Sequence, residues 1–326
     1  MNFGAHPPAT PHPGAASAAW RRRVEEWRVL LAACRHKPGR GRVHRLRVAT
    51  LRLQAQLEWG LTELSGDSPA AHAVARWKKQ ALRLRRLLGP VRSADVSLAK
   101  LARLREEPTR PVAGRRIEIA AACLRDLAKF ETELTRRRKR AAQKLVAALD
   151  DRGKRLDRMA QALAAEVAPC IAQAAGVSVQ AVVQQIAAAA REFPQLDAGN
   201  LHAFRLRLKQ ANYLADLCAP GDRGAPRLAA RLKRMQTAIG EWHDWEVLRR
   251  LAARALPEGG SLVPLLQRRA ATALRRAVSL CKMSMTGLLG SAAAQEPVCD
   301  SAAERKPPVQ IVPPERRPEG QVSTLP

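Results

Sequence analysis

The sequence predicts an all-α protein. Alanine, leucine and arginine, which have high helix propensity, dominate the chain, and the aromatic residues that favour strands make up only 3% of it. Apolar residues also recur at helical spacing through most of the chain. The chain has 326 residues, of which 46% are hydrophobic, so it can bury a substantial core.

Glycine and proline separate the predicted helices. The clearest breakers fall at 37–39, 66–69, 89–90, 107–108, 220–222 and 258–260. In chain order, the helical pattern covers 20–33, 43–64, 70–88, 95–104, 115–149, 154–190, 201–217, 227–239, 245–256 and 262–288. We expect the helix over 115–149 to break or kink near the basic run RRRKR at 136–140.

Composition divides the chain into three parts. Residues 1–17 are rich in proline, alanine and histidine and predict a disordered leader, and the proline-rich residues 291–326 predict a disordered tail. Residues 18–290 form the helical domain. The chain has no signal-peptide pattern and no apolar run of about 20 residues, which a membrane span needs. The six cysteines include no CxxC pair, so we expect reduced thiols in a cytoplasmic protein without membrane association.

The charge of the chain favours an acidic partner. Lysine and arginine together number 57, aspartate and glutamate 29, and the formal net charge is +28. Such a positive field attracts polyanions, whose bound counterions are released when basic residues replace them. Nucleic acid, an anionic membrane surface and a phosphate polymer all satisfy this condition, and the net charge does not choose among them.

An internal repeat relates two halves of the helical domain, about 20–150 and 155–288. VHRLRVATLRLQ at 43–54 matches LHAFRLRLKQAN at 201–212 with an offset of 158 residues. LRLRRLLGPVRSADVSLAKLARL at 82–104 matches KRMQTAIGEWHDWEVLRRLAARA at 233–255 with an offset of 151 residues. Each half contains a His-led basic helix, a second basic helix that ends in glycine, and a further helix after a short turn. The repeat therefore predicts a duplicated helical bundle.

The segment 201–212 carries an unbalanced stripe of charge. His202, Arg205, Lys209 and Asn212 fall on one face of the predicted helix, beside its apolar face. The stripe contains no acidic residue, so its like charges repel each other unless an anion is present. An ordinary solvated helix face is the alternative interpretation. Because the stripe begins again at His44 in the first copy, we favour a ladder of donors for a linear anion.

The second basic helix of each half extends this pattern. In 70–88 and 227–239, basic residues line the side opposite the apolar face, and four inward-facing helices would form a central basic groove. Arginine grips phosphate oxygens in a fork, and lysine acts as a point charge. The predicted anion-binding residues are His44, Arg45, Arg47, Arg52, Arg76, Lys79, Arg83, Arg86, His202, Arg205, Arg207, Lys209, Arg227, Arg231, Arg234 and His243.

At these residues the sequence resembles the CHAD domain family, the "conserved histidine α-helical domain", over roughly residues 20–288. The resemblance lies in the two His-led helices, in the Leu-Gly and Ile-Gly junctions that precede RSADV at 92–96 and HDWEV at 243–247, and in the duplication itself. It implies two pseudo-symmetric four-helix bundles that enclose a basic groove or pore, and it implies binding of inorganic polyphosphate.

Some positions depart from the pattern that is usual in this family. In the first copy, Leu51 and Gln54 stand where basic residues are usual, and Ser93 stands where aspartate is usual. Because the first copy lacks a basic residue at Leu51, we expect the second half to bind more strongly. The second copy departs at Ala203, Gln210 and Asn212.

Metal binding and catalysis find little support in the sequence. His243, Asp244 and Glu246 of WHDWEV do not share one helix face, which a metal site would require. We expect Asp244 to cap the helix that follows it, and Asp95 and Glu246 to hold arginines of adjoining helices. The chain lacks a GxxxxGK[ST] loop, a nucleophile in a recognisable setting and a carboxylate cluster for Mg²⁺, so we expect no enzyme and no cofactor.

The sequence thus predicts a non-enzymatic protein that binds inorganic polyphosphate and associates with polyphosphate granules in the cytoplasm. A nucleic-acid-binding protein without sequence specificity is the main alternative, although the basic faces hold few aromatic residues on which bases could stack. A polyphosphate- or triphosphate-processing enzyme is the second alternative.

Overall fold

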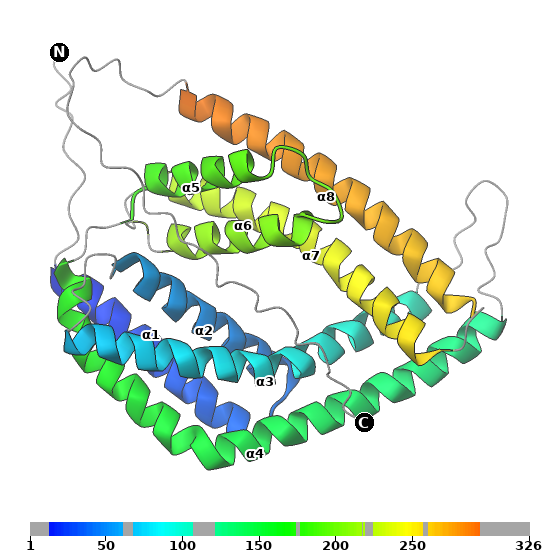
Figure 1. Ribbon diagram of the computed structural model, residues 1–326, viewed down its shortest axis with the longest axis horizontal. Coiled ribbons are helices and arrows are strands. Elements are labelled where there is room, and N and C mark those ends of the chain that lie inside the picture. The colour runs from blue at the N-terminus through cyan, green and yellow to red at the C-terminus, as the bar shows by residue number, and fades with distance from the viewer. Residues whose placement is uncertain are drawn as a thin grey trace, which may run out of the picture.

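The computed structural model describes residues 13–60, 68–106, 121–173, 177–216, 218, 224–256 and 260–293. These ranges contain eight α-helices and no β-strand, which confirms the predicted all-α fold (Figure 1). Residues 1–12 of the predicted leader and residues 294–326 of the predicted tail lie outside the described residues, whereas residues 13–17 and 291–293 are helical. The helices are α1 (Pro13–His36), α2 (Arg40–Gly60), α3 (Pro69–Glu106), α4 (Ala121–Gln173), α5 (Val179–Glu192), α6 (Leu201–Ala215), α7 (Ala225–Ala255) and α8 (Leu262–Ala293).

Two of the predicted helix breaks are wrong. The pattern separated 70–88 from 95–104 and 227–239 from 245–256, but α3 and α7 each continue through the gap. Pro90 lies inside α3 at an exposed position, where a proline costs about 3 kcal/mol. Its neighbours Leu88 and Val91 are fully buried, so packing outweighs this local preference. Ile239 and Trp245 are likewise buried on either side of the predicted break in α7.

The predicted division between 115–149 and 154–190 is also wrong. One long helix, α4, continues through this point to Gln173, and α5 begins only at Val179. Ser178 caps α5, because its side-chain oxygen accepts a hydrogen bond of 3.1 Å from the N–H of Ala181. Figure 1 shows that α4 is bent near its middle, and its two ends consequently pack in different parts of the molecule.

The buried apolar side chains form two cores. The first core is built by α1, α2, the N-terminal part of α3 and the C-terminal part of α4, and it includes the edge contact between Trp27 and Trp77. The second core is built by α5, α6, α7 and α8, together with the C-terminal end of α3 and the N-terminal part of α4. The long helices α3 and α4 therefore contribute to both cores.

The helices α2 and α6 lie next to each other between these cores (Figure 1). Leu46 and Leu53 of α2 are buried in the first core, whereas Phe204 and Leu208 of α6 are buried in the second. Each helix thus anchors its apolar face in a different core. The basic stripes that flank these apolar faces are left in the region between them.

Buried cysteines occur in both cores. Cys34 and Cys281 are free and fully buried, and burial raises the pKa of the Cys34 thiol to about 11 and that of Cys281 to about 12. Both thiols therefore stay protonated near neutral pH, as expected for packing residues rather than reactive ones.

Candidate anion-binding site

The basic stripes of α2 and α6 face each other between the two cores. On α6, Arg205 and Lys209 are half-buried and His202 is exposed. On α2, Arg47 is half-buried and His44 is exposed. The charge of Arg205 acts on Arg47, and the charge of Arg47 acts on Lys209. Bases from two helices 158 residues apart in sequence thus share one electrostatic environment.

Helix α3 adds two arginines that the sequence analysis did not include in the site. Arg85 Nη1 donates a hydrogen bond of 2.9 Å to Gln54 Oε1, and Arg47 Nη1 donates one of 3.5 Å to the carbonyl oxygen of Arg85. Arg92 follows two helical turns later on the same face of α3, and its charge acts on His44. The seven-residue spacing of the two arginines is the signal that could have predicted them.

Helix α7 contributes a histidine and a glycine. The imidazole of His243 stacks on that of His202, with ring centroids 4.5 Å apart and planes inclined by 29°. Gly240, almost one turn earlier, lies against Arg205, and a Cβ at this position would be 3.3 Å from Arg205 Nη2. The missing side chain at Gly240 therefore leaves room for the guanidinium beside the backbone of α7.

These bases form what we call the central basic cluster. Arginines elsewhere in the described chain are often paired with acids, as in the contact of 2.7 Å between Arg28 Nε and Asp157 Oδ1. No member of the central basic cluster forms an ion pair with a carboxylate of the described residues. Its members are His44, Arg47, Arg85, Arg92, His202, Arg205, Lys209 and His243.

The pKa of every base in this cluster lies below its usual value. Burial is the main cause throughout, and neighbouring positive charges add to it at most positions. Burial and the charges of Arg205, Arg47 and Arg85 lower the pKa of Lys209 to about 7. Burial and the charges of His202 and its neighbours lower the pKa of His243 to about 4. An anion at this place would reverse these shifts, because it favours the charged forms.

Two guanidinium groups of the cluster keep a buried donor without a partner. Arg85 Nε and Arg205 Nε are both inaccessible to solvent and form no hydrogen bond within the part of the chain that the structure describes. An unsatisfied buried donor costs roughly 1–3 kcal/mol. The cluster therefore combines uncompensated positive charge with unused hydrogen-bonding capacity.

Two further polar residues border the cluster. Tyr213 is the single tyrosine of the chain, and it is half-buried beside Arg47 and Arg205, where burial raises its pKa. Asp244 is half-buried on α7, and its negative charge acts on Arg205 and Lys209. The sequence analysis missed Tyr213, and it assigned Asp244 to a helix cap.

The expected cap at Asp244 is wrong, because α7 runs through this residue and begins far upstream, at Ala225. The role expected for Asp95 is confirmed: its Oδ1 accepts a hydrogen bond of 2.9 Å from Nε of Arg138 on the adjoining α4. The role expected for Glu246 is wrong. Its carboxylate binds Arg249 and Arg250, at 2.8 and 2.7 Å, and both belong to the same helix.

The other predicted anion-binding residues lie outside the cluster. Arg52 pairs with Asp216 at 3.1 Å, and Arg207 pairs with Glu192 at 2.9 Å. Arg231 donates a hydrogen bond of 3.2 Å to the carbonyl oxygen of Gly287. The remaining residues are exposed, and those on α3 and α7 lie opposite the buried faces of these helices: Arg45, Arg76, Lys79, Arg83, Arg86, Arg227 and Arg234.

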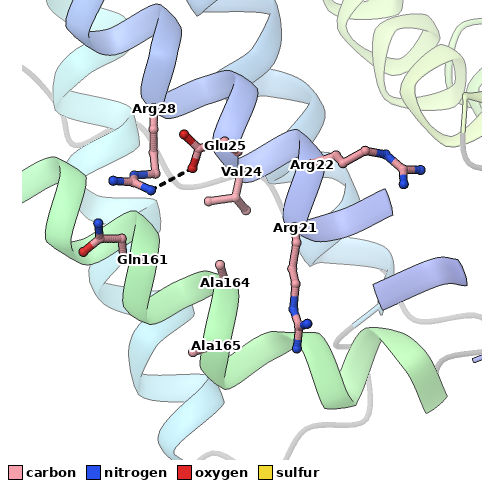
Figure 2. Close-up of a pocket in the computed structure, with 8 residues that line it drawn as sticks. All are labelled: Arg21, Arg22, Val24, Glu25, Arg28, Gln161, Ala164 and Ala165. Atoms are coloured by element: carbon pink, nitrogen blue, oxygen red, sulfur yellow. Dashed lines mark hydrogen bonds and ion pairs between the residues drawn. The ribbon is translucent and has the colours of Figure 1, made fainter. Parts of the chain in front are cut away.

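A pocket elsewhere on the surface offers less to an anion. It lies between α1 and α4, and Figure 2 shows Arg21, Arg28 and Gln161 around it, with the small side chains of Ala164 and Ala165 at its side. Arg28 is already paired with two carboxylates in this region. None of the residues that line the pocket belongs to the central basic cluster, so we do not place the functional site there.

A metal site or a membrane-spanning helix would point to a different function. No group of three or more His, Cys, Asp or Glu side chains among the described residues is arranged to hold a metal ion. No helix of the described residues is long and apolar enough to cross a bilayer.

Fold and site together define a class of protein: an all-helical protein with two cores and a concentration of unpaired bases between them. The sequence profile of the CHAD domain family matches residues 18–253, which is most of the chain. The chain therefore belongs to the CHAD domain family, and the resemblance noted from its sequence is confirmed.

A solved structure supports the fold independently. The crystal structure of the CHAD domain from the plant Ricinus communis superposes with a TM-score of 0.60 at 18% sequence identity. The match covers 88% of this chain and 94% of the plant chain, so both share the same overall architecture. A search of curated proteins found no match.

Proposed function

We propose that this protein binds inorganic polyphosphate through the central basic cluster and does not process it. One observation carries the proposal: the half-buried bases of the cluster have no carboxylate partner, although arginines around them do. Burying positive charge without a counter-ion is costly, and a bound anion removes that cost. Membership of the CHAD family supports polyphosphate as that anion.

The arrangement of the cluster suits a linear anion. Along α6 alone, His202 and Lys209 are separated by about 10 Å at the usual rise per residue. Arg205 and Arg47 can grip phosphate oxygens in a bidentate fork, whereas Lys209 supplies a point charge. The proposal includes a pseudo-symmetric pair of four-helix bundles, in which α2 and α3 of one bundle and α6 and α7 of the other line a basic groove.

The exposed bases that were predicted from the sequence have a secondary role in this proposal. Arg83 and Arg86 on α3, and Arg227 and Arg234 on α7, lie away from the cluster and remain in solvent. Solvent and salt weaken exposed charges, so each of these bases adds little to the affinity for the polymer, although together they add to the positive field that attracts it. They would help the protein to associate with polyphosphate granules in the cytoplasm.

A competition experiment tests the identity of the ligand. Labelled long-chain polyphosphate is bound at near-physiological salt and then challenged with duplex DNA, RNA, orthophosphate and tripolyphosphate, each at equal phosphate concentration. We expect only unlabelled long-chain polyphosphate to displace the label efficiently. Displacement by DNA or RNA would contradict the proposal in favour of nucleic-acid binding.

The same samples test for catalysis. Release of phosphate from polyphosphate or triphosphate is measured with and without Mg²⁺ and Mn²⁺. We expect no release above that of buffer, since the cluster provides bases but no group of carboxylates to hold a metal over a phosphate. Metal-dependent release that is lost on replacement of Arg205 would instead favour a phosphate-processing enzyme.

A further inference from the structure

Two contacts fix the register between the antiparallel helices α6 and α7. Gln236 Nε2 of α7 donates a hydrogen bond of 2.8 Å to the carbonyl oxygen of Leu208 on α6. About two turns further along α7, the imidazole of His243 stacks on that of His202, which lies about two turns earlier on α6. Together these contacts oppose sliding or rotation of one helix against the other, so the residues between them face each other at a defined place.

Gly240 of α7 and Arg205 of α6 face each other at the midpoint between these contacts. A Cβ at Gly240 would lie 3.3 Å from Nη2, 3.8 Å from Nε and 4.0 Å from Cζ of Arg205. The guanidinium therefore lies against the backbone of α7 with its Nε–Nη2 edge. Arg205 forms no hydrogen bond or ion pair with a described residue, and its Nε is inaccessible to solvent. The position of the guanidinium thus depends on the open space at Gly240 and not on a polar partner.

The matching residues of the first half are arranged differently. At the offset of 151 residues, Gly240 corresponds to Gly89, and among the described residues nothing outside its own stretch of helix lies within 4 Å of a Cβ at Gly89. At the offset of 158 residues, Arg205 corresponds to Arg47, whose Nη1 instead donates a hydrogen bond of 3.5 Å to the carbonyl oxygen of Arg85. The glycine at this junction therefore accommodates an arginine only in the second half.

We propose that Gly240 is a positioning residue for anion binding, which holds the Arg205 guanidinium against α7 before the anion arrives. This inference rests on the proposed function. Ordering a long side chain opposes binding, and a side chain that is already held in place avoids part of that cost. An alanine at position 240 would bring a carbon atom closer to Nη2 than ordinary van der Waals contact allows, so the guanidinium would have to move away from α7. Gly240 thus acts through Arg205.

The test measures how the effect of Gly240→Ala depends on Arg205. Affinity for labelled long-chain polyphosphate is measured for the wild type, for Gly240→Ala, for Arg205→Lys and for the double variant. We expect Gly240→Ala alone to weaken binding by about fivefold. Arg205→Lys keeps the positive charge but leaves no guanidinium to displace, so in that background Gly240→Ala should change the affinity by less than about twofold.

Gly153→Ala is the matched control. Gly153 is also buried inside a long helix, α4, and it also lies against an arginine, but a Cβ there would be 3.8 Å from Cδ of Arg35, which is an ordinary contact. We expect the polyphosphate affinity of this variant to equal that of the wild type. Gly89→Ala is a poorer control, because Pro90 follows it and disfavours a helical alanine at the preceding position.

Two binding results would overturn the inference: Gly240→Ala binds polyphosphate as the wild type does, or it weakens binding by the same factor in the Arg205→Lys background. If Gly240→Ala does not fold, adding Arg205→Lys must restore folding. If the wild type binds no polyphosphate, the proposed function fails separately, and melting temperatures still test the contact. Alanine favours the helix at both positions, so Gly240→Ala must gain less stability than Gly153→Ala, and only in the background that retains Arg205.

Discussion

The two halves of the sequence repeat supply their charges to the central basic cluster in different ways. On α6, Lys209 follows Arg205 by one turn, whereas Leu51 stands at the matching position of α2. On α3, the first half provides Arg85, where the matching position of α7 is Gln236. The first half thus lacks a base on α2 but has an additional base on α3. The two halves therefore contribute similar positive charge to the cluster from different helices.

This comparison changes what to expect of the two halves. The expectation that the second half binds more strongly rested on Leu51. Arg85 and Arg92 now lie in the cluster beside His44 and Arg47, so the first half contributes as many bases as the second. We therefore expect contributions of similar size, and the following predictions measure the difference.

The largest effect is expected from the two arginines at matching positions of α2 and α6. Loss of a charge-assisted hydrogen bond costs about 1.5–3 kcal/mol, so Arg47→Ala and Arg205→Ala should each weaken polyphosphate binding by about ten- to a hundredfold. Equal losses would show that the halves contribute equally. The double variant should bind too weakly to measure, and fluorescence anisotropy with labelled polyphosphate provides the readout.

A control is needed for the loss of one positive charge anywhere on the protein. Arg155 on α4 is exposed and forms no ion pair with a described residue, so Arg155→Ala makes the same change outside the cluster. We expect its affinity to stay within twofold of the wild type. A loss as large as that of Arg205→Ala would mean that net charge, and not the cluster, determines binding.

A smaller effect is expected from exchanging the residues at the position where α2 and α6 differ. Lys209→Leu should weaken binding by about five- to tenfold, because one phosphate contact is lost. Leu51→Lys should strengthen binding by a few-fold and lower the melting temperature at low salt, since it adds a like charge to the cluster. Affinity and thermal melts at two salt concentrations check both. Unchanged affinity in Lys209→Leu would exclude Lys209 as a contact.

The histidines should make both the stability of the protein and its affinity for polyphosphate depend on pH, and the two halves should contribute unequally. Burial lowers the pKa of His44 and His202 below 6.5, and that of His243 to about 4. The unfolded chain therefore binds more protons than the folded protein below about pH 6.5, and stability must fall as the pH falls towards 4. Polyphosphate favours the protonated forms, so its affinity should rise a few-fold over the same range.

Replacing the histidines of each half shows which half causes the pH dependence of stability. The second half holds the stacked pair of His202 and His243, so replacing both with Gln should remove most of the loss of stability on acidification, as measured by melting temperature between pH 7 and pH 5. His44→Gln should remove less. Equal effects would show that the stacked pair has no special role. If replacing His44 and His202 leaves polyphosphate affinity unchanged at every pH, these histidines do not bind the ligand.

The smallest effect is expected from exposed bases on the outer face of α3. Replacing both Arg83 and Arg86 with Gln should weaken binding by less than about threefold at physiological salt, because solvent and salt screen exposed charges. Titrations at several salt concentrations separate the two kinds of base: each true phosphate contact that is lost reduces the salt dependence by about one counterion. If the salt dependence of binding falls as much for the Arg83 and Arg86 variant as for Arg47→Ala, the outer face of α3 belongs to the binding site.

Much of the fold could be predicted because it depends on local periodicity. Apolar spacing located the helices, and the start of α6 at Leu201 and of α8 at Leu262 agreed with the structure. The errors occurred at Pro90, at residues 240–244 and at 150–153, where local signals for a break were outweighed by packing. A helix interior tolerates such residues only when burial on both sides compensates, and a sequence does not report that burial directly.

The sequence alone determined that this protein is helical, strongly basic, internally repeated and a member of the CHAD family, since these properties depend on composition and short-range order. It also located the stripe from His202 to Lys209. Only the tertiary structure decided which basic faces meet. Arg85 and Arg92 lie on the face of α3 that turns towards α2 and α6, whereas Arg83 and Arg86 remain in solvent. The physical reason is that desolvation and charge crowding arise between helices far apart in sequence, and periodicity cannot show which helix lies opposite.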